Sequence, residues 1–263
     1  MSILFRRFSR TCTACVCYVL IAFFVSGALS AQTPPRVVAT TPWTAAFAMA
    51  AGVRDVHVLA PYDLRHPPEY ELRATDVVRV QGADLLVFGG YEAMMGRLRA
   101  AIGGDSPQML QIPTDHSRAT LNSSIMTIAE LTGTVDQAEA NLAELMAFID
   151  DWRAEIDATG LSNRTVAVHA FQQAIVRELG ITPDVLFGPG PLSARQIDEI
   201  TRLQPALVID VWHNESATPL RETHPEAVFV SLINFPGRDG TRSLQEVLQH
   251  KRAALTEAVG QLR

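Results

Sequence analysis

Apolar residues recur along the first third of this chain in short continuous runs and in longer stretches with a helical period. The runs at 37–40, 56–59 and 84–90 are short, apolar and bounded by polar or glycine-containing turns, which predicts strands. The intervening stretches 44–53 and 73–83 carry apolar residues at helical spacing. Strands that alternate with helices predict a parallel sheet with crossover helices.

The middle of the chain has only the helical period. A helix is predicted over 121–131, and Gly133 interrupts the pattern. A second helix should then begin after Thr134 as its N-cap and end at Gly160, which makes it more than about 30 Å long at 1.5 Å per residue. Its apolar positions recur every three or four residues: Val135, Ala138, Leu142, Leu145, Met146, Ile149, Trp152 and Ile156.

The alternation of strand and helix resumes after Gly160. Strands are predicted over 165–171, 205–212 and 226–232, and helices over 172–180, 193–204 and 243–262. We therefore expect an α/β protein with two α/β lobes, at 32–132 and 161–263, whose sheets are mainly parallel. One long inter-lobe helix, 133–160, should join them.

The first 31 residues have the composition of a secretory signal peptide. Arg6, Arg7 and Arg10 precede an apolar run over 14–25, and the small residues of 28–31 offer cleavage after Ser30 or Ala31. We expect export to the periplasm, with an uncleaved N-terminal anchor as the alternative.

Cysteine and charge exclude several classes of function. All three cysteines, Cys12, Cys15 and Cys17, lie in the predicted signal, so the mature chain should have neither a disulfide nor a thiolate metal site. The net charge of −6 becomes more negative once the three signal arginines are removed. No nucleic-acid partner is expected, because the phosphate backbone requires clustered Lys and Arg, and Lys251 is the single lysine.

Three of the seven histidines share a setting. His66 and His116 lie in loops before helical stretches, and His169 stands at the end of a predicted strand. Ligands of open α/β sheets gather at the carboxyl ends of the strands, and neutral imidazole is a common zinc ligand. A metal site is one interpretation, and hydrogen-bonded or surface histidines are the other, as we expect for His57, His224 and His250.

Three sequence blocks resemble the periplasmic solute-binding proteins of zinc and manganese ABC transporters (the cluster A-I metal-binding type). They are "VVATTPWTAAFAMAAGVRDVHVL", "HPPEYELRATDVVRVQGADLLVFGGYE" and "TVAVHAFQQAIVRELGI", in the family's order and with a long helix before the third. The resemblance implies two rigid lobes with a metal site in the cleft. It also implies His66, His116 and His169 as ligands, although the motif around His116 reads Thr114–Ser117 without the family's proline. Asp239 is the fourth ligand by the same resemblance, with alternatives in Asp210, His213, Glu215 or water.

These expectations define a function. A nitrogen-rich ligand set favours Zn(II) over Mn(II), which prefers oxygen. We expect a non-enzymatic, monomeric carrier that captures Zn(II) and delivers it to an ABC permease in the inner membrane. A carrier of the same fold for manganese or a metal chelate is the first alternative. A zinc hydrolase with Glu69 or Glu71 as general base is the second, although neither H-E-x-x-H nor G-x-S-x-G occurs in the chain.

Overall fold

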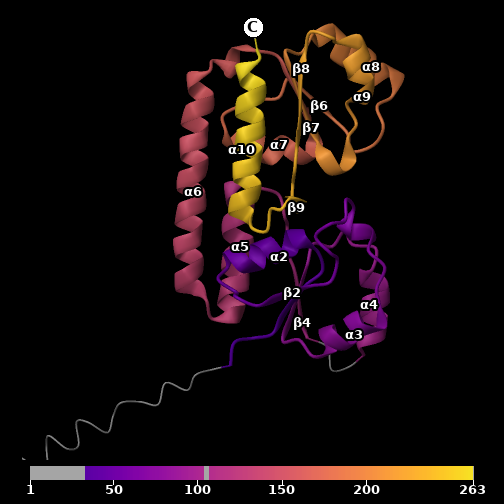
Figure 1. Ribbon diagram of the computed structural model, residues 1–263, viewed down its shortest axis with the longest axis vertical. Helices are drawn as coiled ribbons and strands as arrows, with labels where there is room; N and C mark the ends of the chain where they lie inside the picture. The colour runs from indigo at the N-terminus through magenta and orange to yellow at the C-terminus, as the bar shows by residue number, and fades with distance from the viewer. Residues whose placement is uncertain (1–32, 104–106, 263) are drawn as a thin grey trace, which may run out of the picture. The chain divides into compact units, whose positions relative to one another are not determined.

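The computed structural model describes residues 33–103 and 107–262, and Pro35–Arg263 form one compact unit. The predicted signal peptide lies outside the described residues. The described chain contains two four-stranded sheets, both entirely parallel, which confirms the predicted α/β class (Figure 1).

The first sheet has the strand order β2-β1-β3-β4. Its central strand β3 is buried at every residue, as its continuous apolar run predicts. The strands are β1 (Val37–Ala39), β2 (Val56–Val58), β3 (Leu85–Phe88) and β4 (Gln108–Gln111). The helices of this half are α2 (Pro42–Ala50), the short 3₁₀ helix η1 (Pro67–Glu69), α3 (Ala74–Gln81), α4 (Met95–Ile102) and α5 (Arg118–Thr132).

The second sheet repeats the arrangement with the order β6-β5-β7-β8. Its strands are β5 (Val166–His169), β6 (Val185–Phe187), β7 (Leu207–Val211) and β8 (Val228–Leu232). A further short strand, β9 (Pro236–Asp239), precedes the last helix. The helices are α7 (Gln173–Glu178), α8 (Ala194–Leu203), α9 (Thr218–Thr223) and α10 (Leu244–Gly260), with 3₁₀ turns η2 (Leu161–Asn163), η3 (Ala170–Gln172) and η4 (Trp212–Asn214).

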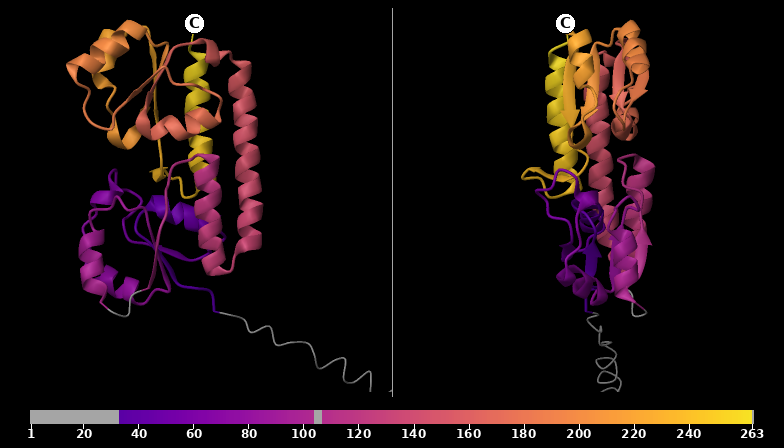
Figure 2. Two further views of the ribbon diagram at one scale, coloured as in Figure 1. Left: turned by 180° about the vertical axis from the view of Figure 1, so that it is seen from behind. Right: turned by 90° about the vertical axis from the view of Figure 1, so that its right-hand side faces the viewer.

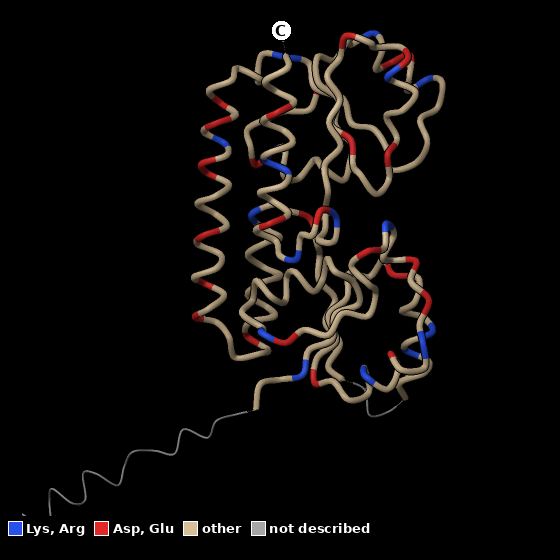
Figure 3. Tube along the Cα trace, in the orientation of Figure 1, with Lys and Arg blue, Asp and Glu red and all other residues tan. Residues whose placement is uncertain are grey.

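The long helix of the middle region is α6 (Val135–Ala158). It runs alongside elements of both halves, and Gly160 follows it in the left-handed conformation (Figure 2). Thr134 is the N-cap, as predicted, but its hydroxyl donates to the carbonyl of Ala51 and makes no capping bond to the helix. Charged residues recur along α6 (Figure 3), and most of them are exposed, as its amphipathic period requires.

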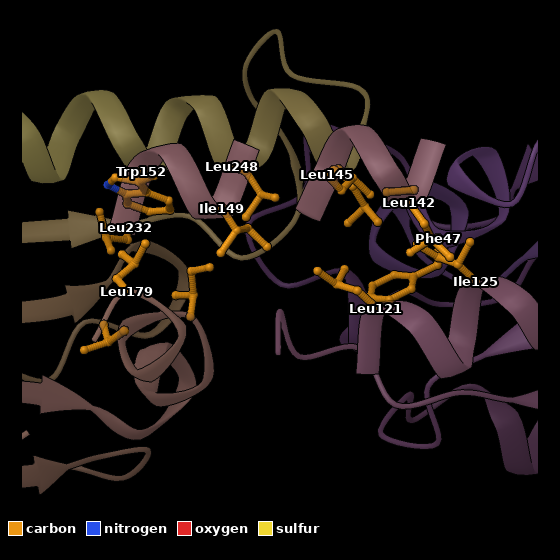
Figure 4. Packing of buried hydrophobic residues seen from close by; sticks show 14 of the residues in the cluster. Phe47, Leu121, Ile125, Leu142, Leu145, Ile149, Trp152, Leu179, Leu232 and Leu248 are labelled. Carbon is orange, nitrogen blue, oxygen red and sulfur yellow. The ribbon is translucent and has the colours of Figure 1, made fainter. Parts of the chain in front are cut away.

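The inner face of α6 contributes to one hydrophobic cluster that includes residues of both sheets. Figure 4 shows its N-terminal half near Phe47, Leu121 and Ile125, and its C-terminal half near Leu179, Leu232 and Leu248. Because this cluster is continuous, the division into lobes at 133 and 160 stays a prediction.

Candidate metal centre

A pocket of about 520 Å³ collects side chains from the carboxyl ends of strands in both sheets. Three histidines line it, each from a loop or turn that directly follows a strand. Its lining includes His66, Glu69, His116, His213 and Asn234, and the aromatic residues Trp43, Tyr91 and Phe171.

His66 lies in the loop between β2 and η1, and it is exposed. The two prolines that follow fix this loop: Pro67 is buried, and the carbonyl of Pro68 accepts from the amide of Ala93 at 3.0 Å. The sequence therefore presents one imidazole at the mouth of the pocket on a stiffened loop.

His116 lies at the inner wall of the same pocket, between β4 and α5, and is only 3 % exposed. The carboxylate of Asp115 accepts from the amide of Ser117 and the hydroxyl of Thr120, so this acid is used to shape the loop. Nδ1 of His116 lies 2.8 Å from the amine of Lys251. Burial, followed by the charge of Lys251, lowers the pKa of His116 well below its usual value.

His169 is the last residue of β5 and is fully buried. Its Nδ1 accepts from the amide of Phe171 at 3.1 Å, and a Cβ on Gly188 would clash with its Nε2. Burial lowers the pKa of His169 to about 4. His169 does not itself line the pocket. The pocket is lined instead by Phe171, whose ring centroid lies 5.1 Å from that of His169.

His213, in η4 after β7, is the histidine of the second sheet that reaches the pocket. Its ring stacks on Phe171 at 5.7 Å and lies 6.4 Å from the ring of His66. Burial lowers the pKa of His213 to about 4, and the neighbouring His66 and His169 add to this effect. Sequence reasoning had placed His213 only among the alternatives for the fourth ligand.

The structure does not bring Asp239 to this pocket. Asp239 ends β9, and its exposed carboxylate accepts from Nε2 of His250 at 2.9 Å and pairs with Arg238 at 3.4 Å. The hydrogen bond from His250 is the main reason that the pKa of Asp239 is lowered. The ligand role of Asp239 therefore has no support from its position.

The remaining acidic alternatives are also engaged. The buried carboxylate of Asp210 accepts from the amides of Val211, Ser216 and Ala217, which folds the 211–217 turn that carries His213. The carboxylate of Glu215 accepts from Ser231 and lies 3.8 Å from the guanidinium of Arg65.

Arg65 joins the two histidine loops. Its guanidinium donates to the carbonyl of Trp212 at 2.7 Å and lies 5.5 Å from the centre of the indole. Since Arg65 precedes His66 and Trp212 precedes His213, this contact holds the two loops next to each other.

Buried ring nitrogens without partners occur on histidines in and beside the pocket, and in the described part of the chain Nε2 of His224 and Nδ1 of His250 share this state outside it. Among the described residues, Nε2 of His116, Nε2 of His169 and Nδ1 of His213 are buried and have no hydrogen-bond partner. Buried polar atoms are rarely left in this state without a ligand or water. As the side chains stand, however, no three His, Cys, Asp or Glu residues of 33–103 and 107–262 are close enough to hold a metal ion.

Sequence reasoning missed Lys251, the residue behind His116. It is 0 % exposed, and burial lowers its pKa to about 7. A signal was present in the sequence, because Lys251 occupies a position of the apolar stripe of its helix, between Leu248 and Leu255.

Comparison with known proteins gives the fold. No protein-family model and no curated protein matches the sequence. The SBP FpvC of Pseudomonas aeruginosa, solved in complex with Ni²⁺ and also with Mn²⁺, superposes with a TM-score of 0.68 in both cases. The Ni²⁺ complex is 18 % identical over 88 % of this chain and 97 % of that chain.

Two further solved structures are similar. The laminin-binding protein Lbp of Streptococcus pyogenes has a TM-score of 0.64 and 15 % identity over 88 % of this chain and 100 % of its own. The Mn-bound periplasmic metal binding protein of candidatus liberibacter asiaticus has a TM-score of 0.62 and 13 % identity, covering 87 % and 100 %. The resemblance seen in the sequence is confirmed at the level of the fold. No helix within 33–103 or 107–262 has the length and apolarity to span a membrane.

Proposed function

We propose that this protein is a periplasmic solute-binding protein that captures a divalent metal ion, with Zn(II) preferred, and delivers it to an ABC-type permease. The observation that supports this most directly is the group of buried, unpartnered imidazole nitrogens on His116, His169 and His213. They come from both halves of the protein: His116 and His213 line one pocket, and His169 lies behind Phe171, which lines it. A metal ion in this pocket would supply the partner that these nitrogens lack.

The proposed ligands are His66, His116, His169 and His213, the last in place of Asp239. Zinc accepts four nitrogen ligands at about 2.0–2.1 Å, so the ligating nitrogens must come within roughly 3.5 Å of each other. Rotation of the His66 and His213 side chains, which are exposed and half-buried, can supply this movement while their loops stay in place. His169 would join the set through a rotation of the Phe171 side chain, which is 43 % exposed and whose ring contacts both His169 and His213.

The donor set also supports the choice of metal. Two carboxylates line the pocket: Asp115 accepts from Ser117 and Thr120, and Glu69 is exposed. Asp210 is bound by backbone amides. A site of neutral imidazoles favours zinc over manganese, which prefers oxygen. Binding of cargo and later release to a permease require no chemical step, so we propose no catalysis.

The size of the pocket favours a second cargo, a metal carried with a small organic chelator. A hydrated ion with six waters occupies on the order of 180 Å³ at about 30 Å³ per water, well below 520 Å³. The rings of Trp43, Tyr91 and Phe171 give the pocket apolar walls against which an organic group would pack.

A hydrolase would need a general base beside an open coordination position. Glu69 lines the pocket but is exposed, and Glu71 does not line it. We therefore consider a zinc hydrolase less well supported than either carrier function.

The test is metal analysis of protein purified without chelator, followed by stripping and titration with Zn²⁺, Mn²⁺ and Zn²⁺–citrate. We expect one zinc per chain and weaker manganese binding. His66→Ala and His213→Ala should each lower zinc affinity by more than the roughly 10- to 100-fold that loss of an outer-shell partner costs. His57→Ala is the control, because His57 lies on β2 beside Arg79 and outside the pocket. A wild-type protein that binds none of these species would refute the proposal.

A further inference from the structure

The hydrogen bond between Phe171 and His169 changes what the pocket offers to a metal ion. The backbone amide of Phe171 donates to Nδ1 of His169 at 3.1 Å, and an amide N–H can only donate. Nδ1 therefore holds the lone pair of this imidazole, and the hydrogen of the ring is on Nε2. A ring nitrogen that carries its hydrogen does not bind a metal, so His169 is not a ligand as it stands.

The position of His169 agrees with this assignment. Its Nε2 faces the backbone of Gly188, where an added Cβ would clash with it, and His169 does not line the pocket. A shell of four imidazoles would require the ring of Phe171 to rotate and His169 to give up its bond to the amide. A shell of the three histidines that line the pocket, His66, His116 and His213, requires neither change.

Three imidazoles leave the coordination of zinc incomplete. Zinc bound by three protein ligands keeps a fourth position for water or another ligand. Because neutral imidazoles add no charge, the bound ion keeps its double positive charge. The pocket offers it the exposed carboxylate of Glu69 and that of Asp115, which already accepts from Ser117 and Thr120. An anionic donor that arrives with the ion would both fill the fourth position and offset its charge.

Two exposed aromatic rings indicate what carries that donor. Tyr91 is 41 % exposed and Phe171 is 43 % exposed, and both line the pocket. No other aromatic residue of 33–103 and 107–262 is among the exposed large hydrophobic side chains. Trp43 adds a third ring, whose centroid lies 5.6 Å from that of Tyr91. Exposed apolar surface inside a pocket is typical of a site for an organic ligand, and a bare ion would leave it uncovered.

We propose that the cargo of this pocket is zinc together with a small organic carboxylate, whose oxygen fills the fourth coordination position and whose flat apolar part packs on Phe171 and Tyr91. Phe171 determines this specificity twice, because its amide keeps His169 from the metal and its ring forms the wall against which the organic group packs. The inference rests on the proposed metal-binding function, and it replaces the fourth imidazole by a donor that the cargo supplies.

The first experiment titrates zinc-loaded wild-type protein with benzoate, and separately with acetate, which has the same carboxylate without the ring. Calorimetry should show one benzoate per chain, bound about 10- to 100-fold more tightly than acetate, as burial of an aromatic ring implies. Zinc should stay bound during the titration, and the metal-free protein should bind benzoate at least about tenfold more weakly. Benzoate that binds no better than acetate, or equally well without zinc, would overturn the inference.

Variants locate the ring of the ligand. Phe171→Ala and Tyr91→Ala, each saturated with zinc, should bind benzoate about tenfold more weakly and should bind acetate as the wild type does, because each variant removes one apolar wall. Leu186→Ala is the matched control, since Leu186 is 40 % exposed but lies on β6 outside the pocket. Equal benzoate affinity in Phe171→Ala, Tyr91→Ala and the control would place the organic group elsewhere and refute the proposal.

The last measurement reads the state of His169 directly and needs no variant. Long-range ¹H–¹⁵N correlation spectra of the wild type should show its hydrogen on Nε2 both without and with zinc. If the wild type binds no divalent metal, the proposed function fails. If it binds zinc and Nε2 of His169 loses its hydrogen on binding, a shell of four imidazoles is formed: the proposed function then stands and the present inference fails.

Discussion

Acid should destabilise the metal-free protein through His169. In the native state the pKa of this fully buried imidazole is about 4, whereas an unfolded histidine titrates near 6.5. As the pH falls below 6.5 the unfolded chain binds a proton that the native protein excludes, so stability is lost between about pH 6.5 and 4. Below about pH 4, His169 is protonated in both the native and the unfolded state, and the free energy of unfolding decreases no further through this residue.

The two pKa values give the size of the effect. Between pH 7.5 and pH 5.0 a single group with these values lowers the free energy of unfolding by about 2 kcal/mol. His213, with a pKa of about 4 and partial exposure, should add a smaller amount in the same direction. The wild-type protein should therefore lose about 2 kcal/mol or more, roughly an eighth to two fifths of the free energy of unfolding of a typical protein.

Urea unfolding at pH 7.5 and pH 5.0, with a chelator present and tryptophan fluorescence as the signal, measures this loss. In His169→Asn the side-chain oxygen can still accept from the amide of Phe171, and the titrating group is gone. The variant should lose about 2 kcal/mol less than the wild type over the same interval. Val168→Ala, a change at a buried neighbour on β5, should lower stability equally at both pH values.

Equal losses in the wild type and His169→Asn would refute the reasoning. That result would mean that the native protein accepts a proton on His169 at no cost, so the imidazole would not be held neutral by burial.

Three further predictions concern the metal. Asp239→Asn should leave zinc affinity within about threefold of the wild type, measured by chelator competition, because its carboxylate binds His250 away from the pocket; a large loss would restore it as a ligand. Zinc affinity should stay nearly constant from pH 7.5 to about 5 and fall at lower pH, measured by chelator competition, because burial holds the pKa of His169 and of His213 at about 4 and imidazoles bind a metal only when neutral. A steep fall already between pH 7.5 and 6 would show that these imidazoles are not held neutral in the metal-free protein. On zinc binding, hydrogen exchange should slow more around 210–216 than around 234–242, because the proposed fourth ligand is His213 and not Asp239. The radius of gyration measured by X-ray scattering should stay nearly constant. A large compaction would show that the continuous core around α6 opens in the metal-free state.

The fold was largely predictable because its long elements have strong periods. The helix of 135–158 appears in the sequence as a regular apolar stripe, and the buried run of β3 appears as continuous apolar residues. The prediction missed β4, whose sequence "QMLQ" has polar ends, and the three-residue strand β6. Strands this short carry too few apolar positions for a period to be visible, and only pairing with a neighbouring strand defines them.

The part of the candidate site that lies at strand ends could be predicted from the sequence. His66 and His116 follow strands and His169 ends one, and the structure places His66 and His116 in one pocket and His169 beside it. The fourth position was not predictable from linear distance, because Asp239 ends a short strand with a positive φ and turns to His250. His213 had the same signal as the others, a histidine just after a buried strand.

Lys251 shows how an exception to a pattern can mark a site. The buried positions of α10 recur at helical spacing, Leu244, Val247, Leu248, Lys251, Leu255, Ala258 and Val259. A lysine at such a position would normally indicate a break in the buried face of the helix. Here the helix continues through it, and the amine is fully buried. The burial of an amine is tolerable only if polar partners from other elements meet it there, and His116, Gln172 and Asn234 do so. Removing the lysine therefore leaves three buried polar groups without their common partner, so Lys251→Met should lower the free energy of unfolding.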